Sequence, residues 1–305
     1  MSSLHRRVGA GALAAVGAAL WFTPAYPHAV CGSRIFPATL GIDDPGVDDE
    51  LALPTLTYLP SNSGGSQEFD AEFSWSKTIT PNTAIVVSDG ATWQHPGGYG
   101  WEPLNTELQW GNFCWPEHEA MATVGFAVGW AGAGTGTQAQ PFNTYQPVID
   151  VGKGFGDLPT SMNLLRPVAL TGELSETVPG QAWTSGNQNP TFLNWGFSVQ
   201  YSLPYYNANV GEISNDFFKH LIPLTEFTFS KPVYNFAPGS NVTTGTIQPG
   251  VVYITGTYQV AVEAIIPLNG ASGHGVGVVA QLDLYLDDLL PDSIGKPIFN
   301  PFGGK

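Results

Sequence analysis

The residues of this chain that could do chemistry are mostly carboxylates, and several recur at every second position of apolar segments. Asp70 and Glu72, for example, alternate with Phe69, Ala71 and Phe73. Side chains at alternate positions of a β-strand lie on the same face of the sheet. The lumen-facing candidates of a closed sheet are then Asp70, Glu72, Glu107, Gln200, Glu226, Gln259, Glu263, Gln281 and Asp283. A negative lumen would favour cations or neutral polar solutes over anions, whereas the same side chains, hydrogen-bonded to one another, would simply fill the interior.

Motifs for covalent or metal chemistry are missing from the sequence. His118-Glu119 is not followed by a second His at the spacing of the zinc motif H-E-x-x-H. The chain also has no G-x-S-x-G turn and no phosphate-binding glycine loop. Two acids on neighbouring strands could still act as a glycosidase pair, but nothing in the sequence selects one. We expect no enzyme, no cofactor and no metal site.

Residues 43–50 form the most acidic segment, D-D-P-G-V-D-D-E. Carboxylate oxygens are ligands that Ca²⁺ prefers, but the segment lacks the spacing of an EF-hand loop. We expect it to be a solvated acidic turn.

Cys31 and Cys114 are the 2 cysteines of the chain. In an oxidising compartment they could pair, which would join the start of the mature chain to the turn that begins at Trp115. A structural disulfide or two free thiols are both compatible with the sequence.

Composition excludes some classes of function. Charged residues make up 11% of the 305 residues, against about 25% in ordinary soluble domains. The net charge of −15 leaves little to neutralise phosphates, so we expect no nucleic-acid partner. Low charge combined with 37 Gly, 9 Trp, 11 Tyr and 17 Phe suits a membrane β-barrel, and also a secreted β-sandwich.

The N-terminus resembles a secretory signal peptide. Arg6 and Arg7 precede an apolar run at 8–22, and small residues follow at Ala25 and Ala29. The apolar run is shorter than the roughly 20 residues of a spanning helix. We assign residues 1–29 to a signal peptide and expect export.

Alternation of apolar and polar residues predicts strands through most of the remaining chain and no amphipathic helix. In the segment 192–203, Trp195, Phe197 and Val199 alternate with small or polar residues. Twelve segments qualify, the first less clearly than the rest: 51–59, 69–79, 83–93, 102–113, 122–130, 144–154, 161–174, 192–203, 219–231, 246–254, 257–267 and 274–287. Short turns alternate with longer loops except at 204–218, which a miscounted strand would explain.

The residues opposite the apolar face of each strand distinguish a membrane barrel from a soluble sandwich. A soluble sheet would place Lys, Glu and Arg opposite its apolar face, whereas here that face carries Gly, Ser, Thr, Gln and isolated acids. Aromatic residues near strand ends are typical of membrane girdles, and the candidates are Trp75, Trp93, Trp110, Trp130, Trp195 and Tyr201. We therefore predict an all-β fold, a transmembrane antiparallel up-and-down β-barrel of about 12 strands.

Three runs of the sequence resemble a known family: V-G-V-V-A-Q-L-D-L-Y-L-D-D-L-L-P-D-S-I-G-K-P-I-F (276–299), W-G-F-S-V-Q-Y-S-L-P-Y (195–205) and D-P-G-V-D-D-E-L (44–51). They are similar to outer-membrane β-barrel transporters linked to the meta-pathway of phenol degradation. The resemblance covers most of the mature chain through diffuse patterns, and it implies an exported barrel pore. The chain departs from the usual barrel pattern because it continues past its last predicted strand to Lys305.

The domain prediction follows from these elements. After the signal peptide we expect an acidic N-terminal segment with a possible first strand at 30–66, the barrel at 67–287 and a C-terminal tail at 288–305. The predicted function is passive transport of small molecules, aromatic or hydrophobic ones among them, through the cell outer membrane, with membrane lipid and solutes as partners. The alternatives are a secreted soluble β-sandwich that binds or hydrolyses carbohydrate, and a structural barrel without transport. The sequence leaves the oligomeric state open.

Overall fold

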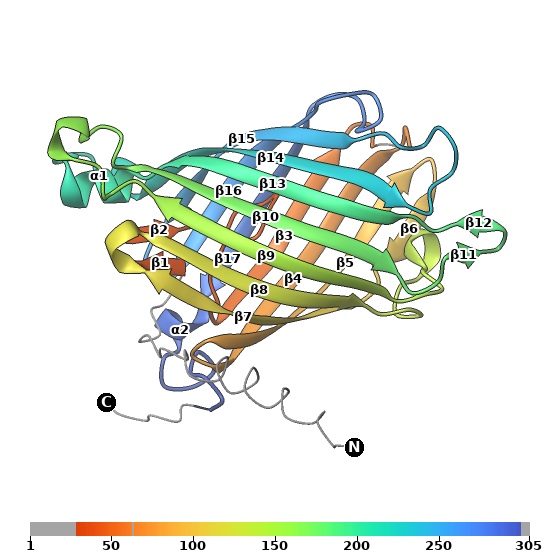
Figure 1. Ribbon diagram of the computed structural model, residues 1–305, viewed down its shortest axis with the longest axis horizontal. Helices are drawn as coiled ribbons and strands as arrows, with labels where there is room; N and C mark the ends of the chain where they lie inside the picture. The colour runs from red at the N-terminus through yellow and green to blue at the C-terminus, as the bar shows by residue number, and fades with distance from the viewer. Residues whose placement is uncertain (1–28, 63, 300–305) are drawn as a thin grey trace, which may run out of the picture.

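The computed structural model describes residues 29–62 and 64–299 as a closed antiparallel β-barrel (Figure 1). Its main sheet has 13 strands, of which the short β6 (Gly98–Trp101) pairs with β5 alone, so that twelve form the barrel wall. The wall strands are β3 (Glu50–Leu59), β4 (Gln67–Thr80), β5 (Thr83–His95), β7 (Asn105–Trp115), β8 (Ala120–Gly129), β9 (Thr144–Gly154), β10 (Val168–Pro179), β13 (Thr191–Tyr201), β14 (Leu221–Tyr234), β15 (Thr244–Ile254), β16 (Tyr258–Pro267) and β17 (Gly277–Tyr285).

Wall strands that follow one another in the sequence pair with each other, and the barrel closes where the last strand, β17, pairs with the first, β3. β4 pairs with β5 over a register that runs from Gln67–His95 to Thr80–Thr83, while β17 pairs with β3. Each wall strand therefore has a hydrogen-bonded partner on both sides, which removes the open edges of a sheet. The predicted twelve-strand barrel is confirmed, and the alternative of a β-sandwich is wrong.

Burial along the strands follows the period of two that the sequence predicts. In β13, Phe197 and Val199 are exposed on the outside, whereas Ser198 and Gln200 are buried. On the outside, Phe197 stacks on Phe227 of β14, with ring centroids 4.7 Å apart. A belt of apolar side chains thus surrounds a polar interior, because adjacent positions of each strand face opposite sides of the wall.

The connections differ between the two ends of the barrel. We call the end that holds Ala29 and Phe299 the terminal end, and the opposite end, with the hairpin β11 (Trp183–Thr184) and β12 (Asn187–Gln188), the loop end (Figure 1). The 204–218 segment lies at the terminal end and contains α1 (Leu203–Asn209), followed by the 3₁₀ turn η4 (Phe218–His220). This segment contains no further strand, since its length is taken up by α1, an irregular stretch at 210–217 and η4.

The bounds of most predicted strands shift by only a few residues in the structure, but one strand begins much later than predicted. The expected strand 161–174 is β10, which begins only at Val168 and continues to Pro179. Residues 160–166 instead form consecutive turns that include η3 (Thr160–Met162). Pro167 explains the late start, because it lacks an N–H for the ladder and restricts the backbone of the residue before it.

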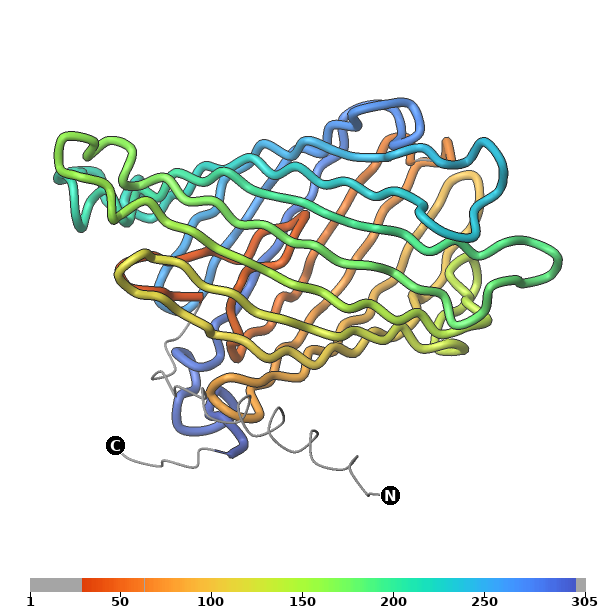
Figure 2. Tube along the Cα trace, viewed as in Figure 1, coloured from red at the N-terminus to blue at the C-terminus, as the bar shows by residue number. Residues whose placement is uncertain are grey.

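The N-terminal segment lies inside the barrel. β1 (Ala29–Cys31) and β2 (Arg34–Phe36) form a hairpin, and residues 37–49 then run through the lumen to β3 (Figure 2). We call residues 29–49 the plug. Two inward glycines make room for it, because a Cβ at Gly196 would collide with Ile42 and one at Gly152 would approach Phe36 Cε1 to 2.9 Å.

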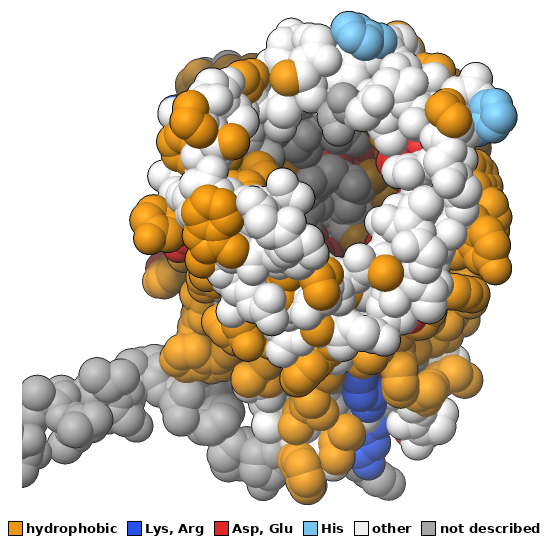
Figure 3. Space-filling model, turned by 90° about the vertical axis from the view of Figure 1, so that its right-hand side faces the viewer, with side chains coloured by type: hydrophobic (Ala, Val, Ile, Leu, Met, Phe, Trp, Pro, Cys, Tyr) orange, Lys and Arg blue, Asp and Glu red, His pale blue; other side chains and the backbone are white. Residues whose placement is uncertain are grey.

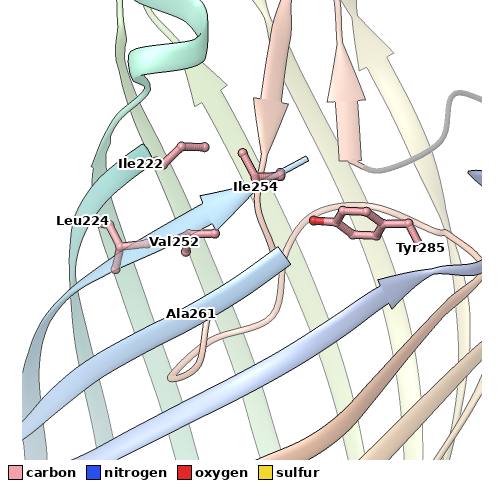
Figure 4. Close-up of a cluster of buried hydrophobic side chains, with 6 residues drawn as sticks. All are labelled: Ile222, Leu224, Val252, Ile254, Ala261 and Tyr285. Carbon is pink, nitrogen blue, oxygen red and sulfur yellow. The ribbon is translucent and has the colours of Figure 1, made fainter. Parts of the chain in front are cut away.

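Two buried apolar clusters fix the plug to different parts of the wall. One joins β14, β15, β16 and β17 through Ile222, Leu224, Val252, Ile254, Ala261 and Tyr285 (Figure 4). Ile35 and Leu40 of the plug pack against it. The other cluster contains Ala29, Cys31 and Phe36 of the plug together with Met121 and Ala169 of the wall. The plug therefore packs against two separate parts of the wall, β14–β17 on one hand and β8 and β10 on the other.

The C-terminal residues remain at the terminal end. α2 (Leu286–Leu289) follows β17 directly, and the amides of Ile298 and Phe299 donate to the carbonyls of Thr78 and Ile79. Among the described helices, none is long and apolar enough to cross a membrane. The predicted signal peptide lies outside the described residues except for Ala29, and so do residues 300–305 of the predicted tail.

Candidate functional site in the barrel lumen

The lumen is hollow at the loop end. Figure 3 views this end and shows an opening with acidic side chains in its wall. A cavity of about 560 Å³ lies there, lined mainly by the polar side chains of Asn62, Glu68, Gln94, Asn194, Thr228, Ser230, Thr244, Thr246 and Ser272. We call this cavity the vestibule. It has the size of a small-molecule pocket, while the plug occupies the lumen toward the terminal end.

The structure places all of the lumen-facing candidates on the buried or half-buried side of their strands. Less than a tenth of the surface is exposed in Asp70, Gln200, Glu226, Gln259, Glu263 and Asp283. The other three, Glu72, Glu107 and Gln281, are half-buried. The sequence pattern missed Asp150, which is 1% exposed on β9, and Glu173 on β10. Both follow the same period of two, and on β9 Pro147 takes an outward position without interrupting it.

Several of these side chains bind the plug. Glu226 Oε2 accepts hydrogen bonds from the amides of Leu40 and Gly41 at 3.0 and 2.5 Å. From β16, Gln259 donates its side-chain amide to the carbonyl of Ala38 at 2.8 Å, and it accepts from the Tyr285 hydroxyl. The polar wall is thus partly a binding surface for the chain's own N-terminal segment.

Other carboxylate oxygens of the wall lack a donor. Both oxygens of Glu263 and both of Asp283 are buried, and within residues 29–62 and 64–299 none of them accepts a hydrogen bond of good geometry, although the amides of Leu40 and Leu284 lie near them. The Glu263 and Glu226 carboxyls reach each other, as do those of Asp283 and Glu50. Two carboxyls at this separation repel when both are charged. A shared proton or a cation between them would relieve that repulsion.

Arg34 fixes the hairpin of the plug to the terminal end. It is fully buried, and its Nη2 lies 3.1 Å from Glu119 Oε2. Its guanidinium also donates to the carbonyls of Pro167 and Arg166 and lies 4.0 Å from the ring centroid of Tyr205. Sequence reasoning missed this pair. The available signal was weak, namely a basic residue within an acidic N-terminal segment.

The acidic segment lies in the lumen and is buried apart from the exposed Asp43 and the half-buried Glu50, so the expectation of a solvated turn is wrong. Asp44, Asp48 and Asp49 are at most 7% exposed. The backbone of the plug explains this, because Thr123 Oγ1 donates to the Pro45 carbonyl at 2.6 Å and Asn112 brackets Val47 with two hydrogen bonds. Each contact draws the segment against a different part of the wall.

Burial and neighbouring charges change the acidity of this segment. Asp49 pairs with Lys77 at 2.6 Å and accepts from Thr78. Within residues 29–62 and 64–299, neither Asp44 nor Asp48 forms an ion pair with a cation. Burial raises the pKa of both carboxyls well above the usual range, and neighbouring charges raise it further. These charges are Asp43 and Asp283 for Asp44, and Asp44 and Asp287 for Asp48.

Cys31 and Cys114 form a disulfide, which ties the first strand of the plug to β7 across 83 residues of sequence. The hairpin is therefore covalently attached to the wall. Residues 37–49 are held only by hydrogen bonds, ion pairs and packing.

The girdle candidates occupy two kinds of position. Trp93 and Trp130 lie near the loop end, while Trp110 and Tyr201 lie near the terminal end, where they pair with Thr83 and Val168. Trp75 and Trp195 lie inside their strands and so depart from the expected strand-end positions. All but the half-buried Trp195 and Tyr201 expose at least 36% of their surface.

The arrangement offers carboxyl, hydroxyl and amide groups that can carry charge and form hydrogen bonds. Among the described residues, no group of three or more His, Cys, Asp or Glu could hold a metal ion. The acids of the described lumen form ion pairs with two cations, Arg34 and Lys77. A solute in the lumen would therefore meet more carboxyl groups than cationic side chains among the described residues.

Comparisons with known proteins give structural similarity at low identity. No protein-family model matches the chain, and no curated protein matches it. Among solved structures it is similar to "KdgM porin" (TM-score 0.46, 8% identity, 77% of this chain and 98% of the other) and to "NanC porin" (0.48, 8%, 77% and 98%). A third is LpxR from Salmonella typhimurium (0.44, 8%, 77% and 99%). Similarity at this level assigns no function, and the resemblance to transporters of phenol degradation stays a prediction.

Proposed function

We propose that this protein is an outer-membrane β-barrel that passes small solutes by diffusion, and that its lumen favours cations and neutral polar molecules over anions. The observation that carries this proposal is the pairing of an apolar outer belt with a hollow, acidic interior. Such a wall suits lipid on one side and water on the other. The plug narrows the route, so passage requires residues 37–49 to move or the solute to be small.

A membrane location is tested first. The full chain, expressed in a Gram-negative host, should fractionate with the outer membrane and migrate differently on SDS gels before and after boiling. A chain recovered from the periplasm without this shift would contradict the proposal.

Ion selectivity tests the pore itself. The purified protein should be inserted in a planar bilayer under a KCl gradient. The sign of the reversal potential should then show that K⁺ passes more readily than Cl⁻. Glu263→Gln together with Asp283→Asn removes two buried carboxyls of the wall and should weaken that selectivity while the boiling shift is kept. The matched control is Glu212→Gln with Asp216→Asn, which removes two exposed acids outside the lumen at the terminal end and should leave selectivity unchanged.

The plug favours one other function, a sealed barrel without transport. It contacts the wall on several sides and is held by a disulfide. A sealed barrel would give no single-channel conductance even in the Cys31→Ser/Cys114→Ser variant, provided that the variant still folds and inserts. A pore would conduct in at least one of the two forms.

A further inference from the structure

The two sides of the vestibule differ in chemistry. On one side Glu68 of β4 projects into the cavity, and its Oε2 accepts hydrogen bonds from Asn62 Nδ2 and Gln94 Nε2, both at 2.7 Å. These two hydrogen bonds fix the orientation of the Glu68 carboxylate, and neither of them uses its second oxygen, Oε1. Asp70 and Glu72 follow on the same face of β4 toward the middle of the barrel.

Hydroxyls and an amide form the opposite side. Thr228 and Thr246 share a hydrogen bond of 2.7 Å, and Ser230 donates to Asn194 Oδ1 at 2.7 Å. A hydroxyl has one donor and two acceptor sites, so each keeps capacity for a further hydrogen bond. These residues come from β13, β14 and β15, across the lumen from β4 in the order of strands around the barrel.

The vestibule has no cationic side chain in its lining, as far as the chain is described. An anionic ligand would therefore lose its hydration without gaining a charged partner, which is costly. A neutral ligand could use the hydroxyl side alone. A ligand with an ammonium group and several hydroxyls would use both sides, and its charge-assisted hydrogen bond to Glu68 would be the stronger contact.

We infer that the vestibule is a binding site for small hydroxylated amines, such as amino sugars and amino alcohols. This inference rests on the proposed function, since it names the solute class that the pore would select, but binding at the vestibule does not itself require conduction. Glu68 binds the ammonium group, and Ser230 and its hydroxyl neighbours bind the hydroxyls.

The test uses three ligands that share one ring. Isothermal titration calorimetry of the full-length protein in detergent at pH 7 would compare D-glucosamine, D-glucose and D-glucuronate. Glucosamine should bind at least tenfold more tightly than glucose, and glucuronate should give no heat above dilution. Glu68→Gln should weaken glucosamine binding about tenfold and leave glucose unchanged, because a charge-assisted hydrogen bond is replaced by a neutral one.

Two further variants separate specific binding from general damage. Ser230→Ala should weaken the binding of glucosamine and of glucose by the same factor, because it removes a contact to hydroxyls that both ligands have. Asp216→Asn, an exposed acid outside the lumen, should change neither. Equal affinity for the three ligands, absence of binding, or a folded Glu68→Gln variant with unchanged glucosamine affinity would overturn the inference.

Conductance of the same preparation keeps the two proposals distinguishable. If glucosamine binds as described but the bilayer records no channel, the proposed pore fails and the binding site stands. If channels conduct but glucosamine does not bind, the binding site fails and the pore stands.

Discussion

Arg34 of the plug and Glu119 of the turn between β7 and β8 form a buried ion pair, with 3.1 Å between Nη2 and Oε2, although 85 residues separate them in the sequence. Glu119 also accepts from the amide of Gly156 at 3.0 Å. The buried Glu119 carboxylate thus joins the plug to the β7–β8 and β9–β10 connections at the terminal end. A buried pair of this kind is costly to break, because the remaining charge stays in a medium of low polarity.

Arg34→Met should therefore lower the free energy of unfolding by about 3–5 kcal/mol. Urea titration of the protein in lipid vesicles, followed by Trp fluorescence, measures this. The double variant Arg34→Met/Glu119→Gln should recover part of the loss, since no unpaired charge is buried. Lys219→Met breaks an exposed pair with Asp216 and should cost at most about 1 kcal/mol. An equal loss in Arg34→Met and Lys219→Met would contradict the role of burial.

Gly196→Ala should loosen residues 37–49 without opening the hairpin. A methyl group at this inward position collides with Ile42 and approaches the Phe227 carbonyl to 3.0 Å. The plug must then shift, and we expect faster proteolysis near Ile42 in the folded barrel. Ile42→Ala in the same chain should restore protection. Gly172→Ala serves as control, because its nearest neighbour would lie at 3.5 Å, an ordinary contact.

Loss of the disulfide should lower the temperature at which the barrel converts to its unfolded mobility on SDS gels. Cys31→Ser/Cys114→Ser removes a cross-link over 83 residues, and the chain-entropy model gives about 4.5 kcal/mol for a loop of this length. Reducing agent should lower the conversion temperature of the native chain to a similar degree. It should have no effect on the variant, and a response there would show that reduction acts elsewhere.

The strand pattern could be predicted from the sequence because it is local. The alternation around Phe197 gives both the strand and its outward face, and neighbouring strands pair in chain order. The plug could not be predicted in this way. Residues 37–49 lack a period of two, and their contacts connect distant positions, such as Gly41 with Glu226. Nothing near residues 43–50 in the sequence indicates that the wall of a barrel will bury them.

Leu108→Arg tests which face meets lipid. Leu108 is 56% exposed on the outside of β7, as the fourth of its 11 residues. An Arg on the lipid face costs a barrel up to about 2–4 kcal/mol, the most at the bilayer centre. The unfolding free energy in vesicles should fall by that amount, while the same variant in detergent should be affected less. Phe218→Arg, on η4 beyond the strand ends, should cost little in either medium. Similar losses in vesicles for both variants would place Leu108 outside the membrane.

The stability of the barrel should fall as pH rises from about 4 through neutrality. Burial raises the pKa of Asp48 well above its usual value of 3.8, and burial together with the charge of Asp288 raises the pKa of Asp287 to about 7. Over this range the folded state binds more protons than the unfolded state, so unfolding becomes easier as protons are lost. Unfolding free energies at pH 5 and pH 8 in vesicles should therefore differ, with the higher value at pH 5. Asp48→Asn should reduce that difference, because an amide does not ionise in the lumen, whereas the exposed Asp216→Asn should keep it. A barrel that is more stable at pH 8, or an Asp48→Asn variant with the same difference, would show that the carboxyls of the plug are charged and satisfied when folded.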